Sequence, residues 1–328
     1  MAKKALRVRS LNALRRGRLL RGMFLLGLLG MGLPAPARDA GESIADHLAK
    51  PSLNVVITVK DMAAAKKFYG DVLGLEPMAA VRFGDKTAPV FFPQAVTMER
   101  FHVGTHEIKL IPGLETTRTY PGGIARGIGL RMVNYPIPDF AAFKNRLKAN
   151  GYPEPKVTEL PGSRFPGPGY RFGMLEDPDG NQVEFFFYEG DGPAGWQESL
   201  QIALTVSDVE ASRRFYAEVL GMRELPPLPM PGDPARRIYL FQVGPTLIKF
   251  WSFGKDLPNR AGRHLEAFGN RYIQYHVKNA DAAHEFVKSR GGRIDLPPTA
   301  VESLPVDILF VADPDGIINE MFAVSVKR

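Results

Sequence analysis

Residues 54–75 combine a short apolar run with a periodic apolar face, a pattern that predicts a strand followed by a helix. Residues 54–59 are rich in β-branched side chains, which is typical of a buried strand. Asp61 follows at a position where its carboxylate can accept hydrogen bonds from the free amides of a first helical turn. Apolar residues then recur at helical spacing, and Gly74 ends the helix; they are Met62, Ala65, Phe68, Tyr69 and Val72.

This pattern of strand, cap and helix occurs four times. The segment over residues 59–75 recurs over residues 206–222, and the Asp-Pro-Asp-Gly sequence at residues 177–180 returns at residues 313–316. Two weaker copies lie over residues 127–151, where Asp139 opens the helix, and over residues 272–291, where Asn279 opens it. Repetition on this scale indicates duplicated domains, and here it indicates four similar units.

The four units predict two α+β domains. Besides its helix, each unit contains strand-like runs, such as residues 100–112, 181–188, 237–252 and 317–324. The Asp-Pro-Asp-Gly sequence has the composition of a tight turn. One helix with several strands per unit is an α+β pattern. The predicted boundaries are a first domain over residues 52–189, a linker over residues 190–197 and a second domain over residues 198–328.

The basic charge of the chain is concentrated in a leader. The formal net charge is +7, but residues 1–37 hold eight basic residues and no acidic one, so the rest of the chain holds 34 basic and 35 acidic residues. No nucleic-acid partner is therefore expected. The basic start, the apolar run over residues 23–33 and the small residues Ala35 and Ala37 are typical of a signal peptide.

We therefore expect cleavage after Ala37, an N-terminal tail over residues 38–51, and a periplasmic or secreted protein. An uncleaved membrane anchor is the alternative, but the eleven residues of the apolar run are too few to span a bilayer, for which about 20 are needed. No stable membrane span is expected after cleavage. The absence of cysteine from the chain excludes disulfides, thiolate nucleophiles and zinc–thiolate sites.

The repeated motifs resemble those of the vicinal-oxygen-chelate superfamily, which includes glyoxalase I, extradiol dioxygenases and bleomycin-resistance proteins. The resemblance rests on a Phe-Tyr-x-x-Val-Leu-Gly helix end, at residues 68–74 and 215–221, and on Asp-Pro-Asp-Gly-x-x-x-Glu, which ends at Glu184 and Glu320. It covers about residues 52–325 and implies two tandem domains, each a pair of βαβββ units that form an open, barrel-like cavity. Such a fold does not by itself select a reaction.

The resemblance also implies where metal ligands would lie, and most of these positions hold unsuitable residues. They are Asn54, Lys109, Gly127 and Glu184 in the first domain, and Gln201, Lys249, Tyr272 and Glu320 in the second. A lysine ammonium carries three hydrogen-bond donors and no lone pair, and a non-haem metal site needs several imidazole or carboxylate ligands. No metal or other cofactor is predicted; a divalent metal, if bound, would use Gln201 and Glu320.

Alternation along the strands adds residues to each predicted cavity. Trp251 shares a face with Lys249, His276 shares a face with Tyr272, and Arg131 shares a face with Gly127. The predicted ligand-binding residues are Asn54, Lys109, Arg131, Glu184, Gln201, Trp251 and Tyr272. His264 is interpreted as a loop position outside the site.

The predicted catalytic residues are Lys249, Glu320 and His276, which the domain boundaries place in one cavity. Lys249 would bind a substrate oxyanion or carbonyl, Glu320 would hold that lysine or act as a base, and His276 would move a proton.

Two classes of function fit this reading. The main interpretation is a binding protein like the bleomycin-resistance proteins, whose small ligand is apolar or aromatic and bears an anionic or carbonyl oxygen. The alternative is an enzyme, a lyase, isomerase or ring-cleaving dioxygenase, which depends either on Lys, Glu and His or on a metal. Whether the chain is an enzyme stays open, and it is expected to be a monomer or homodimer.

Overall fold

The computed structural model describes residues 41–84, 91–114, 116, 118–159 and 167–325. The predicted signal peptide over residues 1–37 lies outside them. No helix in this described part of the chain is long and apolar enough to cross a membrane.

The described residues form four units that each carry four strands. Unit 1 contains β1 (Leu48–Val59), β2 (Glu76–Phe83), β3 (Val96–Val103) and β4 (His106–Pro112). Unit 2 contains β5 (Gly129–Pro136), β6 (Val157–Glu159), β7 (Tyr170–Glu176) and β8 (Gln182–Tyr188). Unit 3 contains β9 (Leu200–Thr205), β10 (Arg223–Met230), β11 (Asp233–Val243) and β12 (Thr246–Trp251). Unit 4 contains β13 (Gly269–Val277), β14 (Arg293–Val301), β15 (Val306–Ala312) and β16 (Ile318–Val324).

Each unit has the helix that the sequence predicts after its first strand. These helices are α2 (Met62–Lys66), α3 (Phe140–Ala149), α4 (Val209–Arg214) and α5 (Ala280–Ser289). The predicted caps are confirmed, because the side chains of Asp61, Asp139, Asp208 and Asn279 each accept a hydrogen bond from a backbone amide of the first turn. After α2 and α4 the chain continues as a π-helical segment, over Lys67–Val72 and Phe215–Val219.

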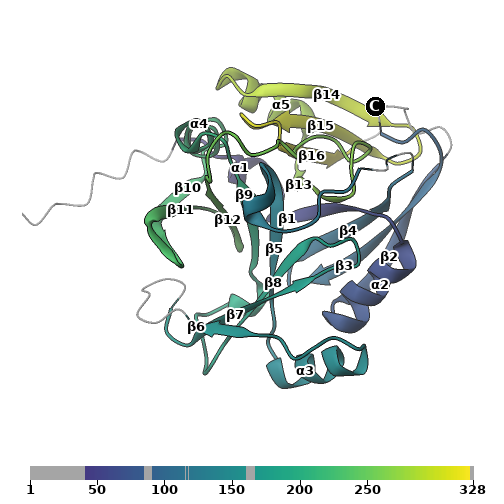
Figure 1. Cartoon of the computed structure of the whole chain (residues 1–328). Helices are drawn as coiled ribbons and strands as arrows, with labels where there is room; N and C mark the ends of the chain where they lie inside the picture. Colours follow the sequence, from purple (N-terminus) through teal and green to yellow (C-terminus); the bar gives the residue numbers. More distant parts are fainter. Residues whose placement is uncertain (1–40, 85–90, 115, 117, 160–166, 326–328) are drawn as a thin grey trace, which may run out of the picture. The chain divides into compact units, whose positions relative to one another are not determined.

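The strands form two eight-stranded sheets, so the predicted α+β class is confirmed. Sheet 1 has the order β14-β15-β16-β13-β1-β4-β3-β2, and sheet 2 has the order β10-β11-β12-β9-β5-β8-β7-β6. At the centre of sheet 1 the antiparallel neighbours are β1 and β13, and at the centre of sheet 2 they are β5 and β9. Figure 1 shows purple β1 beside green-yellow β13, from opposite ends of the chain.

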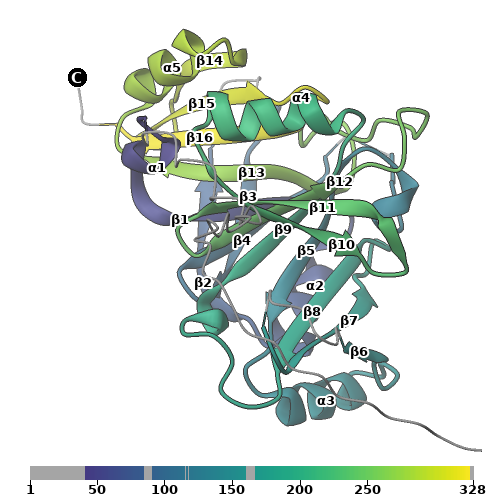
Figure 2. The same ribbon diagram turned by 90° about the vertical axis from the view of Figure 1, so that its left-hand side faces the viewer.

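Each sheet therefore joins one unit from each tandem domain. Unit 1 pairs with unit 4, and unit 2 pairs with unit 3. The expectation that each cavity comes from two consecutive units of one domain is wrong for both sheets: units 1 and 4 lie at the two ends of the described chain, and units 2 and 3 are consecutive but belong to different domains. Two views at right angles show the ribbon of α5 beside β14 and β15 at the outer end of this sheet (Figures 1 and 2).

The segment predicted as an N-terminal tail takes part in the fold. Residues 44–47 form the short helix α1 (Ile44–His47), and β1 begins at Leu48. Ile44 is buried, and its amide donates to the Leu220 carbonyl at 2.9 Å. The amide of Lys278 donates to the His47 carbonyl at 2.8 Å. The tail thereby ties unit 1 to units 3 and 4.

The Asp-Pro-Asp-Gly sequences form the predicted turns before the last strand of their units. In each turn the glycine amide donates to the carbonyl of the first aspartate, Asp177 or Asp313, at 2.9 and 3.0 Å. Gly180 and Gly316 have φ values of +80° and +86°, which favour glycine. These turns set the start of β8 and β16, the strands that carry Glu184 and Glu320.

A buried histidine connects the two sheets. His106, at the start of β4, has Nδ1 at 3.1 Å from the Val103 carbonyl and Nε2 at 2.9 Å from the Thr246 hydroxyl on β12. Thr246 also accepts a hydrogen bond from the Leu53 amide at 2.9 Å. Nδ1 donates to the carbonyl, and in the neutral ring Nε2 accepts from the Thr246 hydroxyl. Burial lowers the pKa of His106 to about 4.

His106 should make the protein sensitive to mild acid. Because its pKa is depressed in the folded state, the unfolded chain takes up the proton first, and stability present above about pH 6.5 is lost as pH falls towards 4. The free energy of unfolding, measured in urea, should fall between about pH 7 and 4 in both proteins. The fall should be about 3 kcal/mol larger for the unmutated chain than for His106→Gln. An equal loss in both proteins would contradict this account.

Candidate functional site

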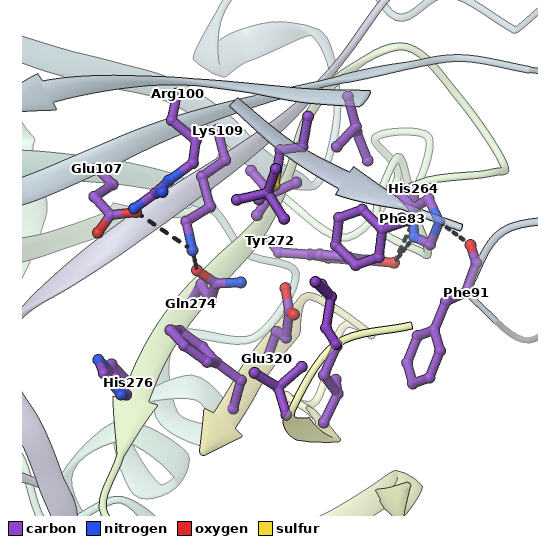
Figure 3. Close-up of a pocket in the computed structure, with 18 of the residues that line it drawn as sticks. Phe83, Phe91, Arg100, Glu107, Lys109, His264, Tyr272, Gln274, His276 and Glu320 are labelled. Atoms are coloured by element: carbon purple, nitrogen blue, oxygen red, sulfur yellow. Dashed lines mark hydrogen bonds and ion pairs between the residues drawn. The ribbon is translucent and has the colours of Figure 1, made fainter. Parts of the chain in front are cut away.

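The structure contains two apolar cavities, one against each sheet. The first has a volume of about 250 Å³ and is lined by side chains of units 1 and 4 and by His264. The second has a volume of about 240 Å³ and is lined by side chains of units 2 and 3. Phenylalanine, valine, isoleucine and leucine side chains form most of the wall of the first cavity. Figure 3 shows Phe83 and Phe91 in this wall, together with the polar groups. Each cavity is thus an apolar space with a small polar centre.

The polar centres of the two cavities occupy equivalent positions in the strands. In sheet 1, Asn54 on β1 lies opposite Gln274 on β13, and Gln274 lies beside Glu320 on β16. In sheet 2, Gln201 on β9 lies opposite Asn134 on β5, and Asn134 lies beside Glu184 on β8. A lysine completes each set, Lys109 beside Val56 and Lys249 beside Ala203, two residues after Asn54 and Gln201 respectively. Each set therefore contains two amides, one lysine and one glutamate.

Lys109 is the central cation of the first cavity. Its ammonium donates to the Gln274 side-chain oxygen and lies 3.5 Å from the Glu107 carboxylate (Figure 3). Asn54 also donates to that Gln274 oxygen, at 3.4 Å, and accepts from the Glu107 amide at 2.8 Å. Among the described residues, Lys109 forms no direct ion pair with Glu320. The ammonium is thus held in position by an amide and a carboxylate at the cavity edge.

Burial shifts the proton affinities of this centre in opposite directions. It lowers the pKa of Lys109, while the negative charges of Glu107 and Glu320 oppose that shift. It raises the pKa of Glu320, while Lys109 and the Gln274 side chain oppose that shift. By contrast, the pKa of Glu107 is lowered to about 2, despite its burial, by Lys109, Arg100 and Lys50. Figure 3 shows the Glu320 carboxylate pointing into the cavity.

The other end of the first cavity carries a neutral histidine and a tyrosine. The Tyr272 hydroxyl accepts a hydrogen bond from the His264 amide at 2.8 Å and contacts His264 Nδ1. The other ring nitrogen of His264 contacts the Phe91 carbonyl, to which it must donate. Burial lowers the pKa of His264 to about 4. The wall here is therefore polar but uncharged near neutral pH.

His276 lies beside Lys109 and not beside Lys249. Its ring stacks on Phe322 at 4.5 Å, and the Lys109 ammonium lies 4.7 Å from the centre of the same Phe322 ring. Burial, Lys50 and Lys109 lower the pKa of His276. It is therefore neutral near pH 7.

The charges of the second cavity are already paired. The Lys249 ammonium lies 3.1 Å from Glu184 Oε1, which also accepts hydrogen bonds from Asn134 and, at 3.4 Å, from Tyr170. Gln201 and Trp251 line the same cavity. The two cavities therefore share one set of residue types but differ in charge arrangement.

The sequence-based grouping of the candidate residues is wrong in three respects. The predicted catalytic partners are separated, because Glu320 and His276 line the first cavity with Lys109, whereas Lys249 lines the second with Glu184. Gly127 lies before β5, and the equivalent strand position is held by Asn134. Arg131 lines neither cavity, because it lies three residues before Asn134 and therefore on the other side of the strand.

Three residues of the centres were missed. Gln274 and Asn134 hold the positions assigned to Tyr272 and Gly127, and His264 lies buried in the wall of the first cavity. Gln274 and Asn134 each lie the same number of residues before the following helix cap, Asn279 and Asp139 respectively. This equal spacing in the sequence identifies them as equivalent positions. No local pattern indicates that the loop carrying His264 reaches the cavity.

The residues present do not fit the divalent metal of the superfamily's metal-dependent members. The equivalent strand positions supply one carboxylate and two amides in each centre, Glu107 adds a second carboxylate beside Lys109 in the first, and each centre also holds an ammonium. Within the described ranges, no group of three or more His, Cys, Asp or Glu side chains is arranged to hold a metal ion. A protonated lysine has no lone pair to offer. Divalent metal sites of this type require more carboxylate or imidazole donors than either centre has.

The Lys249–Glu184 pair yields a stability prediction. Lys249→Met leaves the buried Glu184 carboxylate without its cation, so the free energy of unfolding should fall by roughly 3 kcal/mol at neutral pH. The double variant Lys249→Met/Glu184→Gln should recover most of this loss, because no buried charge is then left unpaired. Denaturant unfolding of both variants measures the effect. A double variant less stable than the single one would contradict the described pairing.

Similar proteins share this architecture. The family model described as the Glyoxalase/Bleomycin resistance protein/Dioxygenase superfamily matches residues 45–185 and 199–321. The structure of glyoxalase I from Zea mays is 20% identical, with a TM-score of 0.57, and the match covers 83% of this chain and 91% of that chain. A putative dioxygenase from Bacillus subtilis is 15% identical, with a TM-score of 0.55, and the match covers 83% and 84%.

No curated protein matches the sequence. At these identities the solved structures show a shared fold alone, and the family model covers most of the chain. The chain belongs to the glyoxalase/bleomycin resistance protein/dioxygenase superfamily, with two vicinal-oxygen-chelate domains in tandem.

Proposed function

We propose that this protein binds a compact organic molecule in the first cavity, through an apolar or aromatic body and an anionic or carbonyl oxygen that faces Lys109. The observation that carries the proposal is a buried lysine ammonium, not paired directly with Glu320, at the polar centre of a cavity whose wall is mostly apolar. No bound metal is part of the proposal. The predicted leader supports export, and N-terminal sequencing of the purified protein, expected to begin at Arg38, tests this part.

The cavity favours a small ligand with an apolar body. Its volume of about 250 Å³ lies below the roughly 300–1,000 Å³ of sites for larger ligands. Phe83, Phe92 and Phe310 contribute aromatic surface to its wall. Aromatic rings pack well against one another in offset or edge-on arrangements. A single substituted ring matches this space and this lining.

The charges favour an anionic or carbonyl oxygen. The cavity is lined by three cationic side chains, those of Lys50, Arg100 and Lys109, and by two carboxylates, those of Glu107 and Glu320. Glu107 accepts from Arg100 and lies within ion-pair distance of both lysines. Burial disfavours the negative charge of both carboxylates, but nearby cations lower the pKa of Glu107, whereas the pKa of Glu320 is raised. An incoming oxygen can therefore bind to Lys109, and the binding of an anion favours the protonated form of Glu320.

The second cavity is the weaker candidate for such a ligand. Lys249 pairs with Glu184 at 3.1 Å, and an anion would have to break that pair, whereas Lys109 shares the Glu107 carboxylate, 3.5 Å away, with Arg100 and Lys50. Separating the partners of a buried ion pair, or removing one of them, costs free energy that ligand binding would have to supply. This difference favours the first cavity as the proposed binding site.

Benzoate tests this assignment by isothermal titration calorimetry, with toluene and benzylamine as neutral and cationic probes. We expect benzoate to bind more tightly than either, and Lys109→Met to weaken benzoate binding at least roughly tenfold, because a charge-assisted hydrogen bond is lost. Lys144→Met, which removes an exposed lysine on α3, is the matched control. No preference for benzoate, or a loss in Lys249→Met with Lys109→Met unaffected, would contradict the proposal.

Ionisation of Glu320 should make the affinity for benzoate depend on pH. Because burial raises its pKa, benzoate affinity should fall as pH rises and Glu320 ionises beside the ligand. Glu320→Gln should bind benzoate more tightly than the unmutated chain at about pH 8 and should lose this pH dependence.

A further inference from the structure

Two buried arginines occupy equivalent positions in the tandem halves. Arg131 on β5 lies three residues before Asn134, and Arg271 on β13 lies three residues before Gln274. They are 6% and 4% exposed, respectively, and line neither cavity. The strands that carry them, β5 and β13, belong to different sheets and are in contact. The contact between these strands brings the two arginines near enough for their charges to interact.

The backbone satisfies only part of their hydrogen-bonding capacity. Arg131 Nη2 donates to the carbonyls of Tyr120 and Gly122 at 2.8 and 3.0 Å. Arg271 Nη1 donates to the Arg260 carbonyl at 3.0 Å, and the Arg260 guanidinium stacks on the Tyr120 ring at 4.3 Å. Buried donors remain without a partner: Nε of Arg131, and both Nε and Nη2 of Arg271. Buried donors of this kind are rarely left unpaired in proteins.

The charge at this place is also uncompensated. Across the described ranges, Arg131, Arg260 and Arg271 form no ion pair with a carboxylate. Glu266, which influences Arg271 electrostatically, accepts instead from the Arg263 amide at 2.9 Å. Burial, Arg260 and Arg271 lower the pKa of Arg131 to about 10, so the guanidinium groups repel one another and stay protonated at neutral pH. Such a cluster needs a counter-ion.

The free donors specify the shape of that counter-ion. Nε and Nη2 of Arg271 form one edge of the planar guanidinium, which matches the two oxygens of a planar oxyanion. We propose that Arg271, with Arg131 Nε, binds a small planar oxyanion, of the carboxylate or nitrate type, between the two sheets. The anion neutralises the arginine cluster and joins the tandem halves, independently of the cavity ligand.

Thermal unfolding of the chain from Arg38 onward, in nitrate or chloride at matched ionic strength, tests this site. Nitrate should raise the melting temperature with the logarithm of its concentration, by roughly 5 °C at about a hundred times its Kd. Arg271→Lys keeps a positive charge but loses the planar edge, so it should lose the nitrate-specific rise. Arg263→Lys, whose side chain instead pairs with Asp295, is the matched control and should keep it.

A crystal structure of the unmutated chain grown in nitrate decides the question even where Arg271→Lys fails to fold. The expected result is a nitrate that accepts hydrogen bonds from Arg271 Nε and Nη2. Water alone on these donors, or an equal response to nitrate and chloride in the unmutated chain, would overturn the proposal.

Discussion

The antiparallel contact between the first strands of distant units is the constraint on which both cavities depend. β1 hydrogen-bonds to β13 and β5 to β9, so each curved sheet is completed by a unit from the other tandem half. Asn54 and Gln274 meet only because of this pairing, as do Gln201 and Asn134. Since the polar centre of each cavity spans one of these antiparallel strand pairs, neither half of the chain contains a complete centre alone.

The pairing of units from the two tandem halves also places one set of residue types in two different sites. In sheet 2, Lys249 reaches Glu184 and the charges neutralise each other. In sheet 1, the Lys109 ammonium pairs with Glu107 and donates a hydrogen bond to Gln274. Glu320 therefore forms no direct ion pair with that lysine. Ion pairing inside an apolar space decides whether an ammonium is available to a ligand. The duplicated fold thus holds two cavities of similar composition that differ in how their lysine is paired.

Local chemistry could be predicted from the sequence, and long-range pairing could not. The helix caps at Asp61, Asp139, Asp208 and Asn279 depend on neighbouring residues, so their positions were predicted correctly. Which unit pairs with which depends on strand edges that many arrangements would satisfy, and the expectation that the two units of one domain pair with each other is wrong. The strand register failed for a related reason, because weak repeats were aligned on Gly127 and Tyr272 instead of Asn134 and Gln274.

The most direct test of the account is a disulfide across the central pair of sheet 1. The chain has no cysteine, so Asn54→Cys/Gln274→Cys can be oxidised mildly and the linked peptides identified by mass spectrometry. We expect an intramolecular disulfide in this variant, since the two positions face each other across β1 and β13. The control Asn54→Cys/Asn134→Cys should remain reduced. A disulfide in the control and none in the first variant would show that unit 1 pairs with unit 2, and would contradict the account.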